Sequence, residues 1–108
     1  MRIHRQKRDT SEALIVAYLR TCGADVCLTD SPCDALVGFL RHSHLVEFKT
    51  GKGKLTQAQK AFQSSWRGSS VVVLRSVDEA AAFIRQCRKD HAEHTIRLVN
   101  QLRKGRAA

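Results

Sequence analysis

The chain has 108 residues and a mass of 12.1 kDa, which is enough for one domain with a single modest core. Hydrophobic residues make up 43% and charged residues 27%, a balance too apolar for a disordered chain. No apolar run reaches the roughly 18 residues of a transmembrane helix. The basic N-terminus is followed by an interrupted apolar run, so we expect no secretory signal peptide and a cytoplasmic protein without a membrane partner.

Charge is the strongest feature of the composition. Nineteen Lys and Arg against ten Asp and Glu give a net charge of +9 and a pI near 10.0. Such an excess points first to a polyanion such as nucleic acid, with plain solubility as the alternative. The basic groups gather in residues 1–8, which form a basic N-terminal arm, and in residues 49–60 and 85–106. We therefore expect a basic patch.

The cysteines and histidines show no metal-binding spacing. No C-x-x-C pair occurs, and no cysteine stands at a zinc-site distance from one of the five histidines. We expect buried or half-buried free thiols in a reducing compartment. The four cysteines are Cys22, Cys27, Cys33 and Cys87.

The first elements are a helix and a short strand. Asp9 and Glu12 fit the N-cap and N3 positions of a capping box, and Gly23 fits the position that follows a helix. Residues 24–29 then alternate as in a strand, and a turn follows at 30–32.

Two strands, a helix, a strand and a long helix complete the predicted order. Residues 34–39 and 44–49 form strands with a tight connection. Thr56 begins a helix with Gln59 at N3, which runs to about residue 65, and the β-branched run at 70–75 is a buried strand. Ser76 and Glu79 cap a last helix over 77–104. The order αβββαβα predicts an α/β fold in one domain, residues 1–108, with a mixed central sheet flanked by helices.

The central hairpin brings acidic side chains together. Asp34 and Glu47 lie opposite each other if the loop has two or four residues centred between Leu40 and Arg41. They then share one face with Lys49, while the other face is apolar. Two facing carboxylates repel unless a cation joins them. Lys49 can do so as a salt bridge, Mg²⁺ fits oxygen ligands better, and surface charge on an exposed face is the alternative.

The hairpin also carries a family resemblance. Pro32-x-Asp34 followed by Glu47-x-Lys49 resembles the PD-(D/E)XK nuclease superfamily, and the stretch 46–59 is similar to its small stand-alone, phage-type members related to VRR-NUC domains. The similarity extends from the first helix to the last and implies a restriction-endonuclease-like core. It also implies an Mg²⁺-dependent deoxyribonuclease.

The resemblance assigns roles around the metal. Asp34 and Glu47 would be ligands of Mg²⁺ or Mn²⁺, with the backbone carbonyl of Phe48 as a third ligand. Lys49 would orient or activate the attacking water and stabilise the developing charge. Glu12 would support the metal or its waters from the first helix, or else cap that helix.

Further residues complete the expected site. Gln59 would line it from the second helix, or else cap that helix. Lys52 and Lys54 would hold the DNA backbone, and we add Lys60 from the same basic segment as a DNA-binding residue.

These observations predict a divalent-metal-dependent DNA endonuclease that hydrolyses phosphodiesters with a metal-activated water. The first alternative is a catalytically silent nucleic-acid-binding protein with the same fold, and another is an interaction protein that docks an acidic partner. The intact set of Asp34, Glu47 and Lys49 favours the enzyme, because a pure binding protein has no need of paired carboxylates near phosphate.

The last helix also predicts an assembly. Ile84, His91 and Leu98 recur every seven residues, and Thr95 and Leu102 continue the stripe. The stripe is longer than a domain of this size needs for its own core, so we expect a homodimer. The alternative is a helix that folds back on the sheet.

Overall fold

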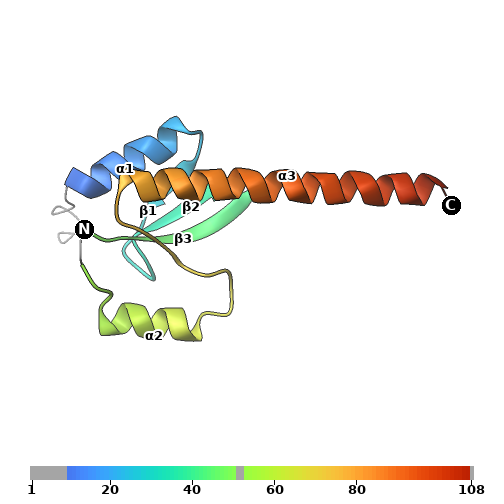
Figure 1. The fold of residues 1–108 in the computed structure, drawn as a ribbon. Helices are drawn as coiled ribbons and strands as arrows, with labels where there is room; N and C mark the ends of the chain where they lie inside the picture. Colours follow the sequence, from blue (N-terminus) through green and yellow to red (C-terminus); the bar gives the residue numbers. More distant parts are fainter. Residues whose placement is uncertain (1–9, 51–52, 108) are drawn as a thin grey trace.

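The computed structural model describes residues 10–50 and 53–107, which form a single small α/β domain (Figure 1). The element order is the predicted αβββαβα. The elements are α1 (Thr10–Thr21), β1 (Asp25–Leu28), β2 (Ala35–Phe39), β3 (His42–Phe48), α2 (Gln57–Ser65), β4 (Val72–Leu74) and α3 (Val77–Ala107).

The four strands form a mixed sheet, as predicted, and the structure places them in the order β1-β2-β3-β4. The β1–β2 and β2–β3 pairs are antiparallel, and the crossover through α2 makes β4 parallel to β3. Phe39 pairs with His42, so Leu40 and Arg41 alone form the turn, at φ angles of 50° and 69°. Positive φ at both central residues fits the twist of a two-residue hairpin. The even-length loop is thus confirmed, and β3 begins two residues earlier than expected.

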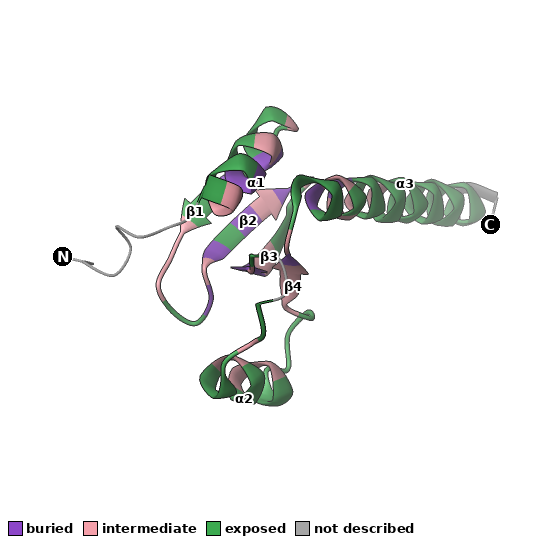
Figure 2. Cartoon of the chain, turned by 60° about the vertical axis from the view of Figure 1, so that its left-hand side comes forward, coloured by how far each residue is buried: buried purple, intermediate pink, exposed green. Residues whose placement is uncertain are grey.

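The helices cover the two faces of the sheet unequally. Figure 1 shows α1 and α3 on one face and α2 on the other. The apolar face of β2 and β3 packs under α1 and α3, because alternate side chains point the same way. Figure 2 shows that most of the buried residues lie between the sheet and the helices α1 and α3, whereas α2 has no buried residue. The core consists of Ile15, Val16, Leu19, Ala24, Val26, Ala35, Val37, Phe39, Val46, Phe48, Leu74, Ala80 and Ile84.

Caps fix where the helices begin and end. Gly23 follows α1 at φ 96°, a conformation that favours glycine. Thr56 and Gln59 form the predicted capping box of α2. Ser76 Oγ accepts a hydrogen bond from the Glu79 N–H at 3.1 Å, which fixes the start of α3. The second hydrogen bond of this cap is shifted by one residue from the expected capping box. The Glu79 carboxylate accepts from the N–H of Arg75 rather than from the N–H of Ser76.

The long helix α3 leaves the domain. Its 31 residues span about 46 Å at 1.5 Å per residue, in a molecule 59 Å long. The N-terminal part of α3 packs on α1 and β4, and residues 92–105 are all exposed (Figures 1 and 2). Thus this second part does not fold back on the sheet. Among the described residues, no helix is long and apolar enough to cross a membrane.

The cysteines are free thiols, as expected, but one expectation about their burial is wrong. Cys33 is buried, and Cys22 and Cys87 are half-buried. Cys27 is exposed, because alternation along β1 directs Val26 into the core and Cys27 to the other face.

Candidate active site

The site begins where β2 starts and β3 ends. The loop between β1 and β2 is closed by the Thr29 N–H, which donates to the Asp34 carbonyl at 2.8 Å. Asp34 immediately precedes β2, and Glu47 is the penultimate residue of β3. Ala35 pairs with Val46, so the same register places Asp34 opposite Glu47. The structure thereby brings together the two acidic residues that the sequence predicts to be neighbours.

Each carboxylate is held by the backbone of the other strand. The Asp34 N–H donates to Glu47 Oε1 at 2.9 Å, and the Phe48 N–H donates to Asp34 Oδ2 at 2.8 Å. The Glu47 side chain is only 2% exposed. Its second oxygen, Oε2, is buried and has no hydrogen-bond partner among the described residues. A buried carboxylate oxygen without a donor is costly unless a proton or a cation joins it.

The environment of Glu47 opposes its charge. Burial, and next the negative charge of Asp34, raise the pKa of Glu47 to about 7 from its usual 4.5. Lys49 acts in the opposite sense and lowers this pKa. Lys49 is half-buried and follows directly after β3, two residues beyond Glu47. A divalent cation would favour the charged carboxylate more strongly than one ammonium does.

A cleft of about 280 Å³ opens over the two carboxylates. Its walls come from the loop before β2, from β3 and from α2, and Gln59 is one of the residues that α2 contributes. Gln59 is also the capping residue, because its Oε1 accepts from the Thr56 N–H at 2.9 Å. Both sequence interpretations of Gln59 therefore describe its position. The lining residues are Asp30, Ser31, Pro32, Asp34, Glu47, Ala58, Gln59 and Phe62.

Sequence reasoning missed Phe62 as a wall of this cleft. A signal existed, because Phe62 follows Gln59 by three residues and Ala58 by four, which places all three on one face of α2. The stacked ring of Trp66 supports Phe62, with ring centroids 5.4 Å apart.

The donor set of the cleft suits a hard divalent cation. Asp34 and Glu47 offer carboxylate oxygens, and Oε2 of Glu47 is a buried oxygen in need of a positive partner. Within the described residues, no group of three or more His, Cys, Asp or Glu side chains is arranged to hold a metal. Asp30 is a third acidic residue of the lining. A site with few carboxylates fits Mg²⁺, because this ion usually keeps several waters.

Glu12 lies in a different layer. It is half-buried in the first turn of α1, and it does not line the cleft. Figure 1 shows that α1 begins at the same end of the sheet at which β3 ends. The structure therefore places Glu12 at the end of the sheet where β3 ends, but not in the lining of the cleft. Asp9, its expected capping partner, lies outside the described residues.

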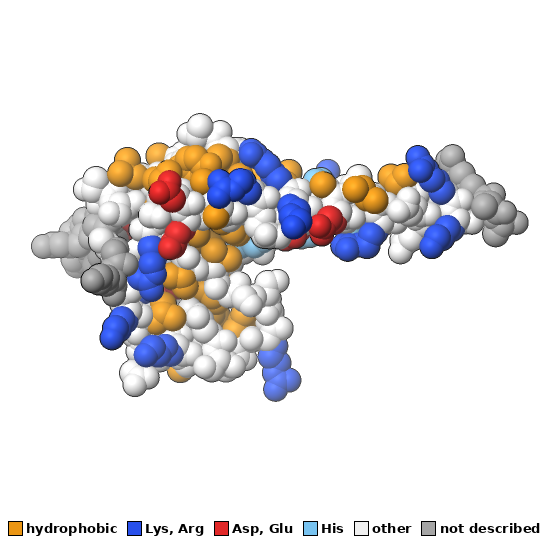
Figure 3. Space-filling model, viewed as in Figure 1, with side chains coloured by type: hydrophobic (Ala, Val, Ile, Leu, Met, Phe, Trp, Pro, Cys, Tyr) orange, Lys and Arg blue, Asp and Glu red, His pale blue; other side chains and the backbone are white. Residues whose placement is uncertain are grey.

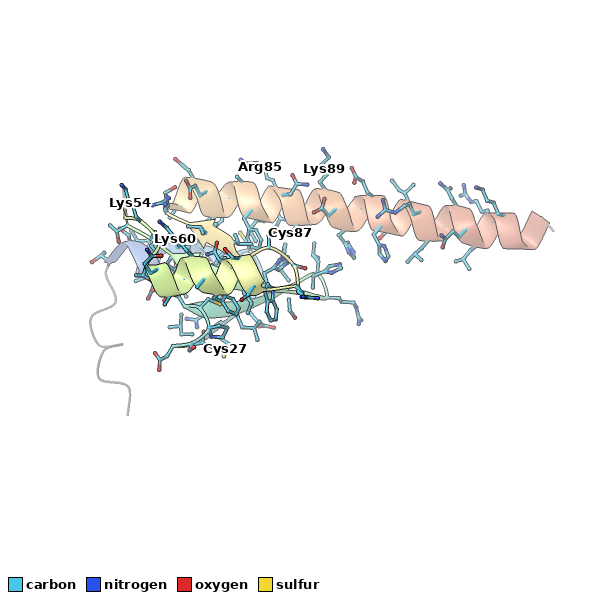
Figure 4. The ribbon with its side chains drawn as sticks, turned by 90° about the horizontal axis from the view of Figure 1, so that it is seen from below. Cys27, Lys54, Lys60, Arg85, Cys87 and Lys89 are labelled. Atoms are coloured by element: carbon cyan, nitrogen blue, oxygen red, sulfur yellow. The ribbon has the colours of Figure 1, made fainter. Side chains whose placement is uncertain are left out.

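The structure describes two of the three lysines that the sequence predicts to bind DNA. Lys54 and Lys60 are exposed, and Figure 4 shows them close to the N-terminal end of α2. The Arg75 guanidinium donates to the Gly53 carbonyl and so ties the segment before α2 to the end of β4. Lys52 lies outside the described residues.

No protein-family model, curated protein or solved structure matches this chain. The resemblance to PD-(D/E)XK nucleases therefore remains a prediction from the motif residues.

Proposed function

We propose that the chain is a divalent-metal-dependent DNA endonuclease with a restriction-endonuclease-like core of the PD-(D/E)XK type. The observation that carries the proposal is the Glu47 carboxylate, which is 2% exposed and has one oxygen without a hydrogen-bond donor among the described residues. A structural carboxylate would be satisfied or solvated. A carboxylate that borders a cleft beside Asp34 instead suits a metal ligand.

Each residue has a role in this proposal. Asp34 and Glu47 would hold Mg²⁺ or Mn²⁺, with the backbone carbonyl of Phe48 as a further ligand. When bound, the ion supplies positive charge beside the scissile phosphate and lowers the pKa of water. Lys49 orients the attacking water and stabilises charge that develops on the phosphate. Gln59 borders the same cleft and can hydrogen-bond to water or substrate there.

Basic groups near the cleft supply the affinity for DNA. Lys54 and Lys60 lie near the start of α2, which forms one wall of the cleft (Figure 4). Figure 3 shows further Lys and Arg side chains along α3. Such contacts act on phosphates and give no base specificity of their own.

The test is cleavage of branched, nicked and linear DNA with Mg²⁺, with Mn²⁺ and with chelator. Wild-type protein should cut only with metal, and Asp34→Asn or Glu47→Gln should lower the rate by several orders of magnitude. Asp25→Asn is the matched control, because it removes the same charge from an exposed position on β1. Cutting in excess chelator would disprove the metal mechanism.

A catalytically silent DNA-binding protein with the same fold is the second candidate. It is favoured by the donor set, since no group of three or more His, Cys, Asp or Glu side chains is arranged to hold a metal in the part of the chain that the structure describes. Tight DNA binding without cleavage of any substrate, with either metal, would establish it.

A further inference from the structure

The second part of α3, residues 92–105, is a helix with no neighbouring element in the described structure. We name it the free half of α3. Large hydrophobic side chains gather on it and are visible in Figure 3. Monomeric proteins rarely leave such side chains clustered in water. Their exposed fractions are 59% for Ile96, 46% for Leu98, 39% for Val99 and 68% for Leu102.

Two of these side chains, Leu98 and Leu102, extend a face that the domain itself buries. Ala80 and Ile84 are 0% and 1% exposed, at the part of α3 that packs on the core. Leu98 follows Ile84 by two heptads, and Leu102 follows by one further turn. A period of seven keeps residues near one side of a helix. The buried face of α3 therefore continues past the edge of the domain with nothing packed on it.

A small groove lies where α3 leaves the domain. Its volume is about 140 Å³, and most of its lining is apolar surface. Burial raises the pKa of the Cys87 thiol and lowers the pKa of His44, whose Nε2 lies 3.8 Å from Cys87 Sγ. Both groups are therefore neutral at pH 7, and the groove suits an apolar side chain. The lining residues are Phe39, His42, His44, Cys87 and Asp90.

We propose that two copies of the chain pair through antiparallel α3 helices, so that the free half of each lies across the groove of the other. When Leu102 of one copy lies opposite Cys87 of the other, Leu98 lies opposite His91. The same contacts repeat on both sides of a two-fold axis, as a closed homodimer requires. The axis passes near His94 and Thr95.

Antiparallel pairing would cover both the groove and the exposed hydrophobic side chains of the free half of α3. In a parallel pair the two grooves would meet at one end and the two Leu102 side chains at the other. In the antiparallel pair each groove receives a leucine from the partner, and the helix dipoles oppose favourably.

The stripe of Leu98 and Leu102 is itself uncharged, which suits burial against a second copy. At 100° per residue, Arg97 falls about 100° from Leu98 on one side of the stripe, and Arg103 falls about 100° from Leu102 on the other side. The hydrophobic stripe can therefore be buried between two copies without burying like charges.

The first test is sedimentation of the full chain without DNA or metal, so its outcome does not depend on the proposed nuclease activity. Wild type should be a dimer at micromolar concentration. Leu98→Glu should raise the dissociation constant on the order of 100-fold, because a charge would be buried in the seam. Asn100→Glu changes the net charge equally on the opposite side of the helix and should have no effect. His91→Leu should tighten the dimer, because it adds a leucine opposite Leu98.

The second test reports the direction of pairing. In Leu102→Cys protein, mild oxidation should link the new thiol to Cys87 of the other copy and give a covalent dimer. The two positions within one chain are about 22 Å apart along α3, which prevents an internal bridge. Wild type and Asn100→Cys are the controls for linkage through the exposed Cys27.

A monomeric wild type at high micromolar concentration would overturn the proposal. Equal weakening by Leu98→Glu and Asn100→Glu would overturn the seam, and a dimer in which Leu102→Cys gives no more linkage than the controls would overturn the antiparallel register.

Discussion

Asp34 and Glu47 fix each other through the backbone, with the Asp34 N–H on Glu47 Oε1 at 2.9 Å and the Phe48 N–H on Asp34 Oδ2 at 2.8 Å. Each hydrogen bond uses one carboxylate oxygen as the acceptor, and the side-chain amide of Asn or Gln has one carbonyl oxygen that can accept in its place. Asn at position 34 and Gln at position 47 can therefore keep these hydrogen bonds while losing the charge. For this reason the amide variants separate the chemistry of the site from its folding.

The first prediction concerns stability and pH. The folded-state pKa of Glu47, about 7, lies above its usual 4.5, so the folded protein binds more protons than the unfolded chain between these values. Stability from this group is therefore fully present below pH 4.5 and is lost as the pH rises through 7. The loss amounts to up to about 3 kcal/mol. Thermal unfolding in chelator should show Tm falling between about pH 5 and pH 8.

Glu47→Gln is the control for this effect. The neutral amide should remove most of the decline and should be more stable than wild type at about pH 8. Added Mg²⁺ should raise the wild-type Tm more at about pH 8 than at pH 6, because the ion competes with the proton for the carboxylate. A flat wild-type profile would contradict a raised pKa for the buried Glu47 carboxylate.

The second prediction compares opposite charges in the site. Lys49→Ala and Glu47→Gln should both abolish cleavage. Their effects on DNA affinity should have opposite signs, because one variant removes a positive charge near phosphate and the other removes a negative charge. Fluorescence anisotropy with labelled DNA measures both affinities. Tighter binding by Lys49→Ala would place this side chain away from the substrate.

The third prediction concerns the basic groups by the cleft. Lys54→Ala combined with Lys60→Ala should weaken binding to all DNA sequences alike. The slope of log K against log salt should shrink by about 0.9 for each phosphate that the protein no longer neutralises. Arg85→Ala with Lys89→Ala, along α3 in Figure 4, removes the same charge at a distance and tests whether position matters. Equal slopes for the two double variants would reject a DNA path beside α2.

The hairpin register was predictable because two local rules agree. Side chains alternate along a strand, and an odd separation of 13 between Asp34 and Glu47 makes them opposite when the turn is even. The caps at Thr56 and Ser76 were predictable for a similar reason, since short-range hydrogen bonds decide where a helix begins.

The burial of Glu47 was not predictable from its strand. Alternation assigns Glu47 to the polar face of β3, where exposure is the ordinary expectation for a carboxylate. Its burial depends on tertiary structure, namely the loop before β2 and α2, which form the walls of the cleft. The position of Glu12 outside the cleft was not predictable either. It depends on α1 and α2 covering opposite faces of the sheet, which the spacing of residues along the chain does not determine.

The fourth prediction separates the two parts of α3. Ile84→Ala should destabilise the domain by about 2–5 kcal/mol, because it leaves a cavity in the core. Leu98 lies on the same face of the helix but is 46% exposed. Leu98→Ala should therefore leave the free energy of unfolding of the domain nearly unchanged in dilute protein. Chemical denaturation of both variants makes the comparison. A large destabilisation by Leu98→Ala in a dilute monomer would mean that the free half packs on its own domain.

The last prediction separates the two roles of Gln59. Its side chain caps α2 through the Thr56 N–H and also borders the cleft with Glu47. Gln59→Ala should cost α2 about 1 kcal/mol, and α2 has no buried residue to compensate. Gln59→Glu keeps an acceptor at N3, so the cap and the Tm should survive.

The same variant adds a carboxylate to the cleft, beside Asp30, Asp34 and Glu47. Gln59→Glu should therefore tighten Mg²⁺ binding in calorimetry and weaken DNA binding, because a negative charge attracts the ion and repels phosphate. Gln63→Glu, one turn later on α2 and outside the lining of the cleft, is the matched control. If Gln59→Glu and Gln63→Glu change Mg²⁺ and DNA affinity equally, Gln59 acts only as the cap of α2.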